Sequence, residues 1–137
     1  MKILSEYIEE HKLLLNKWIG RWSMEEYKKA FQTFKHMNET NNIKNIIQDI
    51  SNLEFNIDHV ELVNDLVQIR KEIKNKNFNV VYITGKPQDI VFSHLYAKAL
   101  QNEHSYKYCT TAKSAIEILS LNMSLHDLEN RLSKLNK

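Results

Sequence analysis

Cysteine, glycine and proline are nearly absent from this chain of 137 residues, which contains one cysteine, two glycines and one proline. The single Cys109 excludes an internal disulfide framework and a zinc site built from cysteines. Because it stands at the end of a predicted strand, we expect it to be a small core residue and not a nucleophile. Two glycines also leave little material for a loop that binds phosphates.

One segment, TGKPQD at 84–89, does place Gly85 and Lys86 after a predicted strand, as a phosphate-binding Walker loop does. That loop needs an earlier glycine, where Val80 stands, and a serine or threonine after the lysine, where Pro87 stands. The segment therefore predicts a turn and no nucleotide site.

Long apolar runs are absent as well. No stretch approaches the roughly 20 apolar residues that a membrane-spanning helix needs, so no transmembrane segment is expected. The N-terminal segment carries Glu6, Glu9 and Glu10 where a signal peptide needs an unbroken apolar core. These features predict a cytoplasmic protein.

The chain also lacks a strong excess of either charge, with a net charge of +2. Its lysines are scattered, whereas a nucleic-acid-binding protein gathers its basic residues on one face, so no nucleic-acid partner is expected. The six histidines form no closely spaced pair that would suggest a metal site. Without a grouping of nucleophile and base, we expect no catalytic residues, no cofactor and no metal, and the chain is predicted not to be an enzyme.

What the chain does contain is the composition of one soluble globular domain, with 42% apolar and 26% charged residues. Hydrophobic periodicity predicts an N-terminal hairpin and then alternating helices and strands. The expected strands are 3–10, 12–20, 45–50, 78–84 and 106–109, and the expected helices are 24–37, 58–73, 88–102, 111–121 and 124–135. This order predicts an α/β fold with a mixed sheet of about five strands, in a single domain over 1–137 with an appended C-terminal helix at about 124–135.

The stretch QDISNLEFNIDHVE at 48–61 joins a strand to a helix. We expect the strand to end in Asp49 and Ser51, and the helix to begin at Asp58, whose carboxylate can cap the first turn. An acidic, hydroxyl-bearing corner at the end of a strand is a candidate binding site.

In this region the sequence NIIQDISNLEFNIDHVELV resembles a segment of the STAS superfamily, typified by anti-anti-sigma factors. The family pattern is an Asp-(Leu/Ile)-Ser strand end followed by Ile-Asp-Ser-Ser-Gly-Leu at the start of a helix. Asp49, Ile50 and Ser51 match the first half, and Ile57 and Asp58 match the second. The segment YCTTAKSAIEIL is similar to the last strand and helix of that family.

The chain more closely resembles the SpoIIAA-like branch of this superfamily, small bacterial proteins of STAS/SEC14 type. In that branch a Trp-x-Gly-x-x-(Ser/Thr)-x-Glu-Glu-Tyr pattern opens the first helix, as the segment from Trp18 to Tyr27 does here. The resemblance covers about residues 3–120 and implies a STAS fold without enzymatic activity. The final helix lies beyond it.

The sequence departs from the family at the phosphorylated position. Switchable anti-anti-sigma factors carry a phosphoacceptor as the second serine after the aspartate, and here His59 and Val60 follow Asp58, with Glu61 in place of glycine. Valine cannot be phosphorylated. The resemblance thus implies the family scaffold without its switch.

Two functions remain open at this stage. The first is a regulatory module that binds a protein partner or itself, with Ser51, Asp58 and His59 as contact residues and His59 as the most exposed of them. The second, implied by the SEC14 association, is a carrier or sensor of a small apolar ligand. Its pocket would be lined by aromatic residues, with Trp18, Trp22, Phe31 and Tyr82 as candidates.

The last predicted helix carries leucines at positions 125, 128, 132 and 135. This stripe must be buried, either against the chain's own sheet or in a homodimer formed through the 124–135 helix. The sequence does not decide between them.

Overall fold

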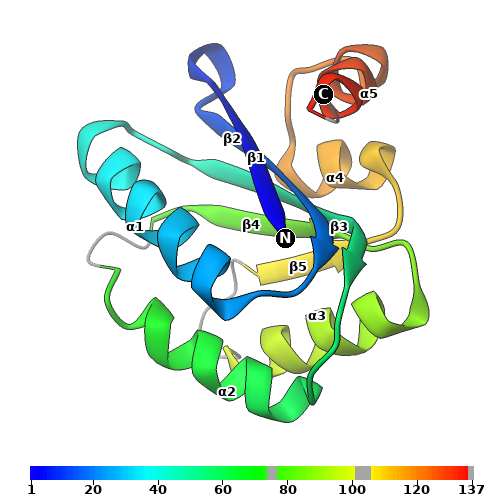
Figure 1. Ribbon diagram of the computed structural model, residues 1–137. Coiled ribbons are helices and arrows are strands. Elements are labelled where there is room, and N and C mark those ends of the chain that lie inside the picture. Colours follow the sequence, from blue (N-terminus) through cyan, green and yellow to red (C-terminus); the bar gives the residue numbers. More distant parts are fainter. Residues whose placement is uncertain (74–76, 101–105, 136–137) are drawn as a thin grey trace.

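The computed structural model describes residues 1–73, 77–100 and 106–135 (Figure 1). The order of its strands and long helices is the predicted one. The elements are β1 (Lys2–Ile8), the short 3-10 helix η1 (Glu9–His11), β2 (Leu13–Arg21), α1 (Met24–Thr40), β3 (Asn45–Glu54), α2 (His59–Arg70), β4 (Asn79–Ile83), α3 (Pro87–Ala99), β5 (Tyr106–Cys109), α4 (Ala112–Leu119) and α5 (Leu125–Lys134).

The five strands form one sheet in the order β1-β2-β3-β4-β5. β1 pairs with β2 in antiparallel orientation, and each later pair is parallel. Parallel neighbours need a crossover connection, and α1, α2 and α3 supply the three crossovers. The predicted α/β fold with a mixed sheet of five strands is confirmed.

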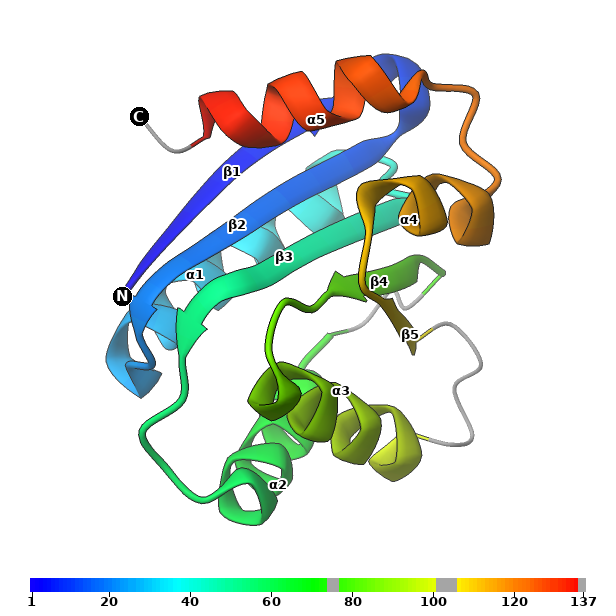
Figure 2. The same cartoon turned by 90° about the vertical axis from the view of Figure 1, so that its right-hand side faces the viewer.

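Helices cover both faces of the sheet because side chains alternate along each strand. α1, α2 and α3 lie on one face, where Leu14, Ile46 and Val80 belong to the larger hydrophobic core. α4 and α5 lie on the other, over Leu15, Ile47 and Val81. Figures 1 and 2 show the two layers of helices on opposite sides of the sheet.

The prediction that the third strand ends in Asp49 and Ser51 is wrong. β3 continues to Glu54, and Leu53, deep in the core, is one of its added residues. The extension follows a shift in the β2–β3 register between Lys17 and Ile19, after which three residues of β2 pair with Asn52, Leu53 and Glu54. A local pattern in one strand does not reveal this shift, because it is a property of the pair.

The TGKPQD segment forms a turn that starts α3, as predicted. The Asp89 carboxylate accepts hydrogen bonds from the backbone amides of Gly85 (2.8 Å) and Lys86 (2.9 Å), and Pro87 occupies the first position of the helix. The Lys86 ammonium donates to the Ser51 carbonyl oxygen at 2.7 Å, which ties the turn to β3. The predicted end of this helix at 102 lies outside the described residues.

Two of the four leucines of the α5 stripe, Leu128 and Leu132, are buried against the chain's own sheet. Leu128 and Leu132 belong to the hydrophobic cluster on this face, and Leu128 has no exposed surface. The guanidinium of Arg131 binds Glu6 of β1 at 2.6 Å. Buried Lys17 of β2 donates to the Leu132 carbonyl oxygen at 3.3 Å, near the negative end of the helix dipole. α5 therefore packs on the chain's own sheet, and Figure 2 shows it lying along β1 and β2. A homodimer through this helix stays a prediction.

Two leucines of α5 provide a matched test of this docking. Leu128→Ala should lower the free energy of unfolding by about 2–5 kcal/mol, because it leaves a cavity under the helix. Leu125→Ala should lower it by about 1 kcal/mol or less, since Leu125 is 37% exposed. Urea denaturation of both variants measures the difference, and equal losses would contradict the packing described here.

Candidate functional site

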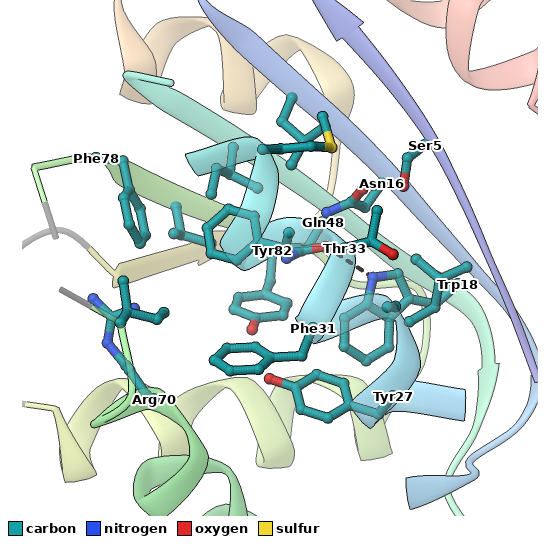
Figure 3. Close-up of a pocket in the computed structure, with 18 of the residues that line it drawn as sticks. Ser5, Asn16, Trp18, Tyr27, Phe31, Thr33, Gln48, Arg70, Phe78 and Tyr82 are labelled. Atoms are coloured by element: carbon teal, nitrogen blue, oxygen red, sulfur yellow. Dashed lines mark hydrogen bonds between the residues drawn. The ribbon is translucent and has the colours of Figure 1, made fainter. Parts of the chain in front are cut away.

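A pocket of about 310 Å³ lies between α1 and the sheet (Figure 3). Its floor comes from β1, β2, β3, β4 and β5, its roof from α1, and one end from the last turn of α2. This volume falls at the small end of the roughly 300–1,000 Å³ range of small-molecule sites. The lining residues are Ile3, Ser5, Leu14, Asn16, Trp18, Tyr27, Ala30, Phe31, Thr33, Phe34, Met37, Ile46, Gln48, Arg70, Ile73, Phe78, Val80, Tyr82, Tyr96 and Tyr106.

The walls of the pocket are largely aromatic, since eight of these residues are Phe, Tyr or Trp. Their rings pack in a continuous series on the α1 side. Tyr27 lies 5.6 Å from Trp18 and 6.1 Å from Phe31 between ring centroids, and Phe31 lies 6.3 Å from Phe34. Such a wall offers ring faces and edges to an apolar or aromatic molecule.

A row of polar side chains crosses the floor of the pocket. Ser5, Asn16, Gln48 and Tyr82 are register partners on four adjacent strands, and Tyr108 continues the row on the fifth. All lie on the face of the sheet that α1, α2 and α3 cover, where the neighbouring residues Leu14, Ile46 and Val80 are apolar. Polar side chains in such a layer are expected to be hydrogen-bonded, because burying an unbonded one is unfavourable.

Two hydrogen bonds in this row use the amide oxygens. The Ser5 hydroxyl donates to Asn16 Oδ1 at 2.6 Å, and the Trp18 indole nitrogen donates to Gln48 Oε1 at 2.8 Å. No hydrogen bond among the described residues uses the amide nitrogens of Asn16 and Gln48. The floor therefore presents two amide donors to a molecule in the pocket.

Arg70, the last residue of α2, closes one end of the pocket. It is 3% exposed, and its guanidinium lies over the rings of Tyr106 (4.3 Å to the centroid) and Phe78 (5.3 Å). It also donates a hydrogen bond to the Tyr106 hydroxyl. Cation–π contacts of this kind hold a guanidinium in one place. Among the described residues that line the pocket, Arg70 is the only charged one.

Burial controls the ionisation of the tyrosines around Arg70. It raises the pKa of Tyr82 and Tyr106 well above the ordinary value of 10.0, and the nearby Tyr96 acts in the same direction. Burial also raises the pKa of Tyr27 well above its ordinary value, although the residue as a whole is only half-buried. The positive charge of Arg70 lowers these pKa values, but by less than burial raises them. The three phenols are neutral near pH 7 and can donate hydrogen bonds.

The pocket brings together most of the predicted aromatic residues. Trp18, Phe31 and Tyr82 line it, whereas Trp22 lies behind Trp18, with 5.9 Å between their ring centroids, and does not. Whether these residues bind a ligand stays a prediction. Asn16, Gln48 and Arg70 also line the pocket and were not predicted from the sequence. A signal was present for two of them, because Asn16 and Gln48 each stand at a core-facing position of a strand whose other core-facing residues are apolar.

The candidates of the 51–61 region lie at a different place, at the far end of β3 and the start of α2. The Ser51 hydroxyl donates a hydrogen bond to the Asp49 carboxylate at 2.6 Å, so this hydroxyl already has a structural role. Asp58 caps α2 by accepting from the amides of Val60 (2.9 Å) and Glu61 (3.1 Å). Each of these polar groups therefore has a local bonding role, and their role in partner binding stays a prediction.

The prediction that His59 is the most exposed of these candidates is wrong. Its ring is partly buried and packs against Phe55, with 5.2 Å between ring centroids. Asp58 is exposed, and the adjacent Val60 is 59% exposed. The first turn of α2 directs His59 toward Phe55 and Val60 toward solvent, an orientation that the spacing in the sequence does not determine.

The described residues contain no group of three or more histidine, cysteine or acidic side chains arranged to hold a metal ion. Cys109 donates through Sγ to the Thr111 carbonyl oxygen at 3.4 Å, and burial raises the pKa of its thiol. A raised pKa disfavours the reactive thiolate. In the same described ranges, no helix is both long enough and apolar enough to cross a membrane.

These features define an α/β protein with a small, aromatic-walled pocket under its first helix, and comparison with known proteins specifies the fold. No family model matches the sequence, and no curated protein is significantly similar to it. Among solved structures, the unphosphorylated form of the anti-sigma factor antagonist SpoIIAA is similar. It superimposes with a TM-score of 0.54 over 85% of this chain and 96% of that one, at 12% sequence identity. The chain therefore has a SpoIIAA-like fold, as the resemblance implied.

The raised pKa values of the pocket tyrosines predict how the stability of the folded protein changes at alkaline pH. Above pH 10 they ionise in the unfolded chain but stay neutral in the folded protein, so the unfolded state binds fewer protons. The free energy of unfolding should then fall as the pH rises from 10 toward the raised pKa values. Urea denaturation at increasing pH measures this fall, which should be smaller in Tyr82→Phe. If the native and unfolded protein developed phenolate absorbance at the same pH, the expectation would be wrong.

Proposed function

We propose that this protein binds a small, largely apolar molecule in the pocket between α1 and the sheet, as a carrier or sensor, and that it does not transform this molecule. The observation that carries the proposal is the pocket of about 310 Å³ itself. Protein interiors are packed nearly as densely as organic crystals, and voids larger than a few water molecules are unusual in a core of this size. A pocket that is maintained by a continuous aromatic wall supports a binding role.

The chemistry of the lining supports binding without catalysis. Neutral phenols, amides and ring faces surround the pocket, and one guanidinium closes it. Acid–base catalysis needs a group that exchanges a proton near neutral pH. Arginine and tyrosines with raised pKa values do not supply one. Orientation and retention of a ligand are what such groups provide.

A second candidate function is a regulatory module that binds a protein partner, without a phosphorylation switch. The observation that favours it is the exposure of three apolar side chains in the first turns of α2 and α3, Val60 (59%), Val91 (49%) and Ile90 (40%). These side chains stand near the N-terminal ends of two helices that contact each other, and exposed apolar residues of neighbouring helices are candidates for an interaction surface. The solved structure with the similar fold is that of an anti-sigma factor antagonist, which supports a regulatory role on this scaffold.

Partial filling of the pocket tests the first function. Ala30→Leu on α1 places three extra carbon atoms inside the pocket, whereas Ala97→Leu adds the same atoms at a similarly half-buried position of α3 outside it. Native mass spectrometry of each protein, purified gently from its own source, should show a fixed small extra mass on the wild type and on Ala97→Leu. Ala30→Leu should lose that mass while keeping its melting temperature. A wild-type protein without any extra mass would contradict the proposal.

The same spectra test the second function. A protein-binding module should appear with a second chain attached, and Val60→Asp should release this chain because a charge is placed in an apolar contact. Glu61→Asp, a change of similar position that keeps the charge, serves as control. Retention of the partner by Val60→Asp would exclude this surface as the interface.

A further inference from the structure

Resting on the proposed function, we propose that the ligand is an uncharged aromatic compound with a carbonyl oxygen, and that the side-chain amides of Asn16 and Gln48 both donate hydrogen bonds to this oxygen. Figure 3 shows the two amides next to each other on the floor of the pocket, with Trp18 on one side of Gln48 and Tyr82 on the other. The rings of the ligand would lie against the aromatic wall while its oxygen meets the floor.

The orientation of the Gln48 amide is set by its neighbour Trp18. An indole N–H can only donate a hydrogen bond, so the atom of Gln48 that lies 2.8 Å from it is the amide oxygen. The amide nitrogen then points away from Trp18, and no hydrogen bond among the described residues uses it. Because Gln48 lines the pocket, this donor is available to a molecule inside it.

The Asn16 amide is arranged in the same way and is deeply buried. Its oxygen accepts the hydroxyl proton of Ser5 at 2.6 Å, a usual distance for a hydrogen bond between two oxygens, and the residue is only 8% exposed. Its amide nitrogen also has no hydrogen bond within the described part of the chain. A donor buried to this extent without a partner is unfavourable, and a ligand that supplies an acceptor removes that cost.

The two donors can converge on one oxygen atom. Asn16 and Gln48 are direct register partners on the parallel strands β2 and β3, and neighbouring strands lie about 4.8 Å apart. Side chains that project from the same face at this separation can donate to a single acceptor between them. A carbonyl oxygen has two lone pairs and accepts two hydrogen bonds at once, which matches a pair of amide donors.

The same floor disfavours a ligand group that is charged or that mainly donates. Ser5 and Tyr82, the neighbours of the two amides in the polar row, are uncharged near pH 7, and a buried ionised group needs a charged partner beside it. A group that donates would find both amide oxygens already bonded, one to Ser5 and the other to Trp18. The group that fits this position is an uncharged acceptor.

The aromatic wall and the volume define the rest of the molecule. Tyr27 and Phe31 of α1 continue the ring series that begins at Trp18. Their faces and edges favour a flat ring body over a flexible chain. A volume of about 310 Å³ accommodates a small ring system and not a long acyl chain.

Three probes with one bicyclic carbon skeleton test this inference. They are alpha-tetralone, which carries a carbonyl, alpha-tetralol, which carries a hydroxyl in its place, and tetralin, which has neither. Isothermal titration calorimetry measures their binding to the whole protein. We expect alpha-tetralone to bind at least about tenfold more tightly than tetralin, because tetralin would leave two buried donors unpaired. The alcohol should fall between them, since its proton finds no open acceptor at the floor.

Variants of similar side-chain size assign the preference to the two amides. Asn16→Leu and Gln48→Met each remove one amide, and each should lower the preference for alpha-tetralone over tetralin by about threefold. The double variant should show no preference. Asn52→Leu, the same kind of change at an exposed position of β3 outside the pocket, is the matched control and should bind like the wild type. Near-ultraviolet circular dichroism shows which variants keep their packing.

An infrared measurement on the wild type tests the inference even if a variant packs poorly. Hydrogen bonds to a carbonyl oxygen weaken its double bond. The carbonyl stretching band of bound alpha-tetralone should therefore lie at clearly lower wavenumber than the band of the same compound in hexane. A band at the hexane position would overturn the inference.

The outcomes separate this inference from the proposed function. Equal binding of alpha-tetralone and tetralin by the wild type would overturn the inference and leave the proposed function standing, as would a preference that survives in the double variant. A retained native ligand together with no binding of any probe would also overturn the inference alone. No retained mass and no probe binding would overturn both.

Discussion

The parallel register of β2, β3 and β4 is the constraint on which the pocket depends. It aligns Asn16 with Gln48, and Gln48 with Tyr82, so that three polar side chains from distant parts of the sequence lie in one row. β1 adds Ser5 to the same row by antiparallel pairing with β2. A slip of one residue in any of these pairs would exchange the faces of a strand, so that its polar side chain would lie under α4 and α5; in β2, Leu13 and Leu15 would then lie under α1. The floor of the pocket is thus a product of pairing, and no single strand contains it.

The two faces of the sheet serve different purposes. Under α4 and α5 the contacts are aliphatic, with Leu13, Leu15 and Ile47 fully buried beneath Ala115 and Leu128. Under α1 the side chains are large and aromatic, and their rings contact one another along edges and faces while leaving a hollow between them. Rigid rings do not fill irregular space as aliphatic side chains do, which makes this layer suited to holding a pocket open. The stable layer supports the strands whose other face forms the site.

The sequence was sufficient for the fold and only partly sufficient for the site. Periodicity and the capping residue Asp58 identified the elements, because these signals are local and Asp58 does cap its helix. Aromatic content correctly predicted that Trp18, Phe31 and Tyr82 line a pocket. The same prediction for Trp22 was wrong, because its ring packs behind Trp18. The end of β3, the orientation of His59 and the approach of Arg70 to Tyr106 depend on how elements meet. Pairwise geometry of that kind has no signature in a single segment.

Besides burying its leucines, α5 supplies a hydrogen-bond acceptor to the buried ammonium of Lys17. This charge lies within the sheet layer and reaches a carbonyl oxygen near the C-terminal end of the helix. A chain shortened before Ser124 would lack the Leu132 carbonyl oxygen that accepts a hydrogen bond from this ammonium. It would also expose the aliphatic face of β2 and β3 to solvent. Although α5 is the last described helix of the chain, it is a component of the domain's core and not an extension of it. Boundaries for a minimal folded unit of this protein should accordingly be drawn after α5.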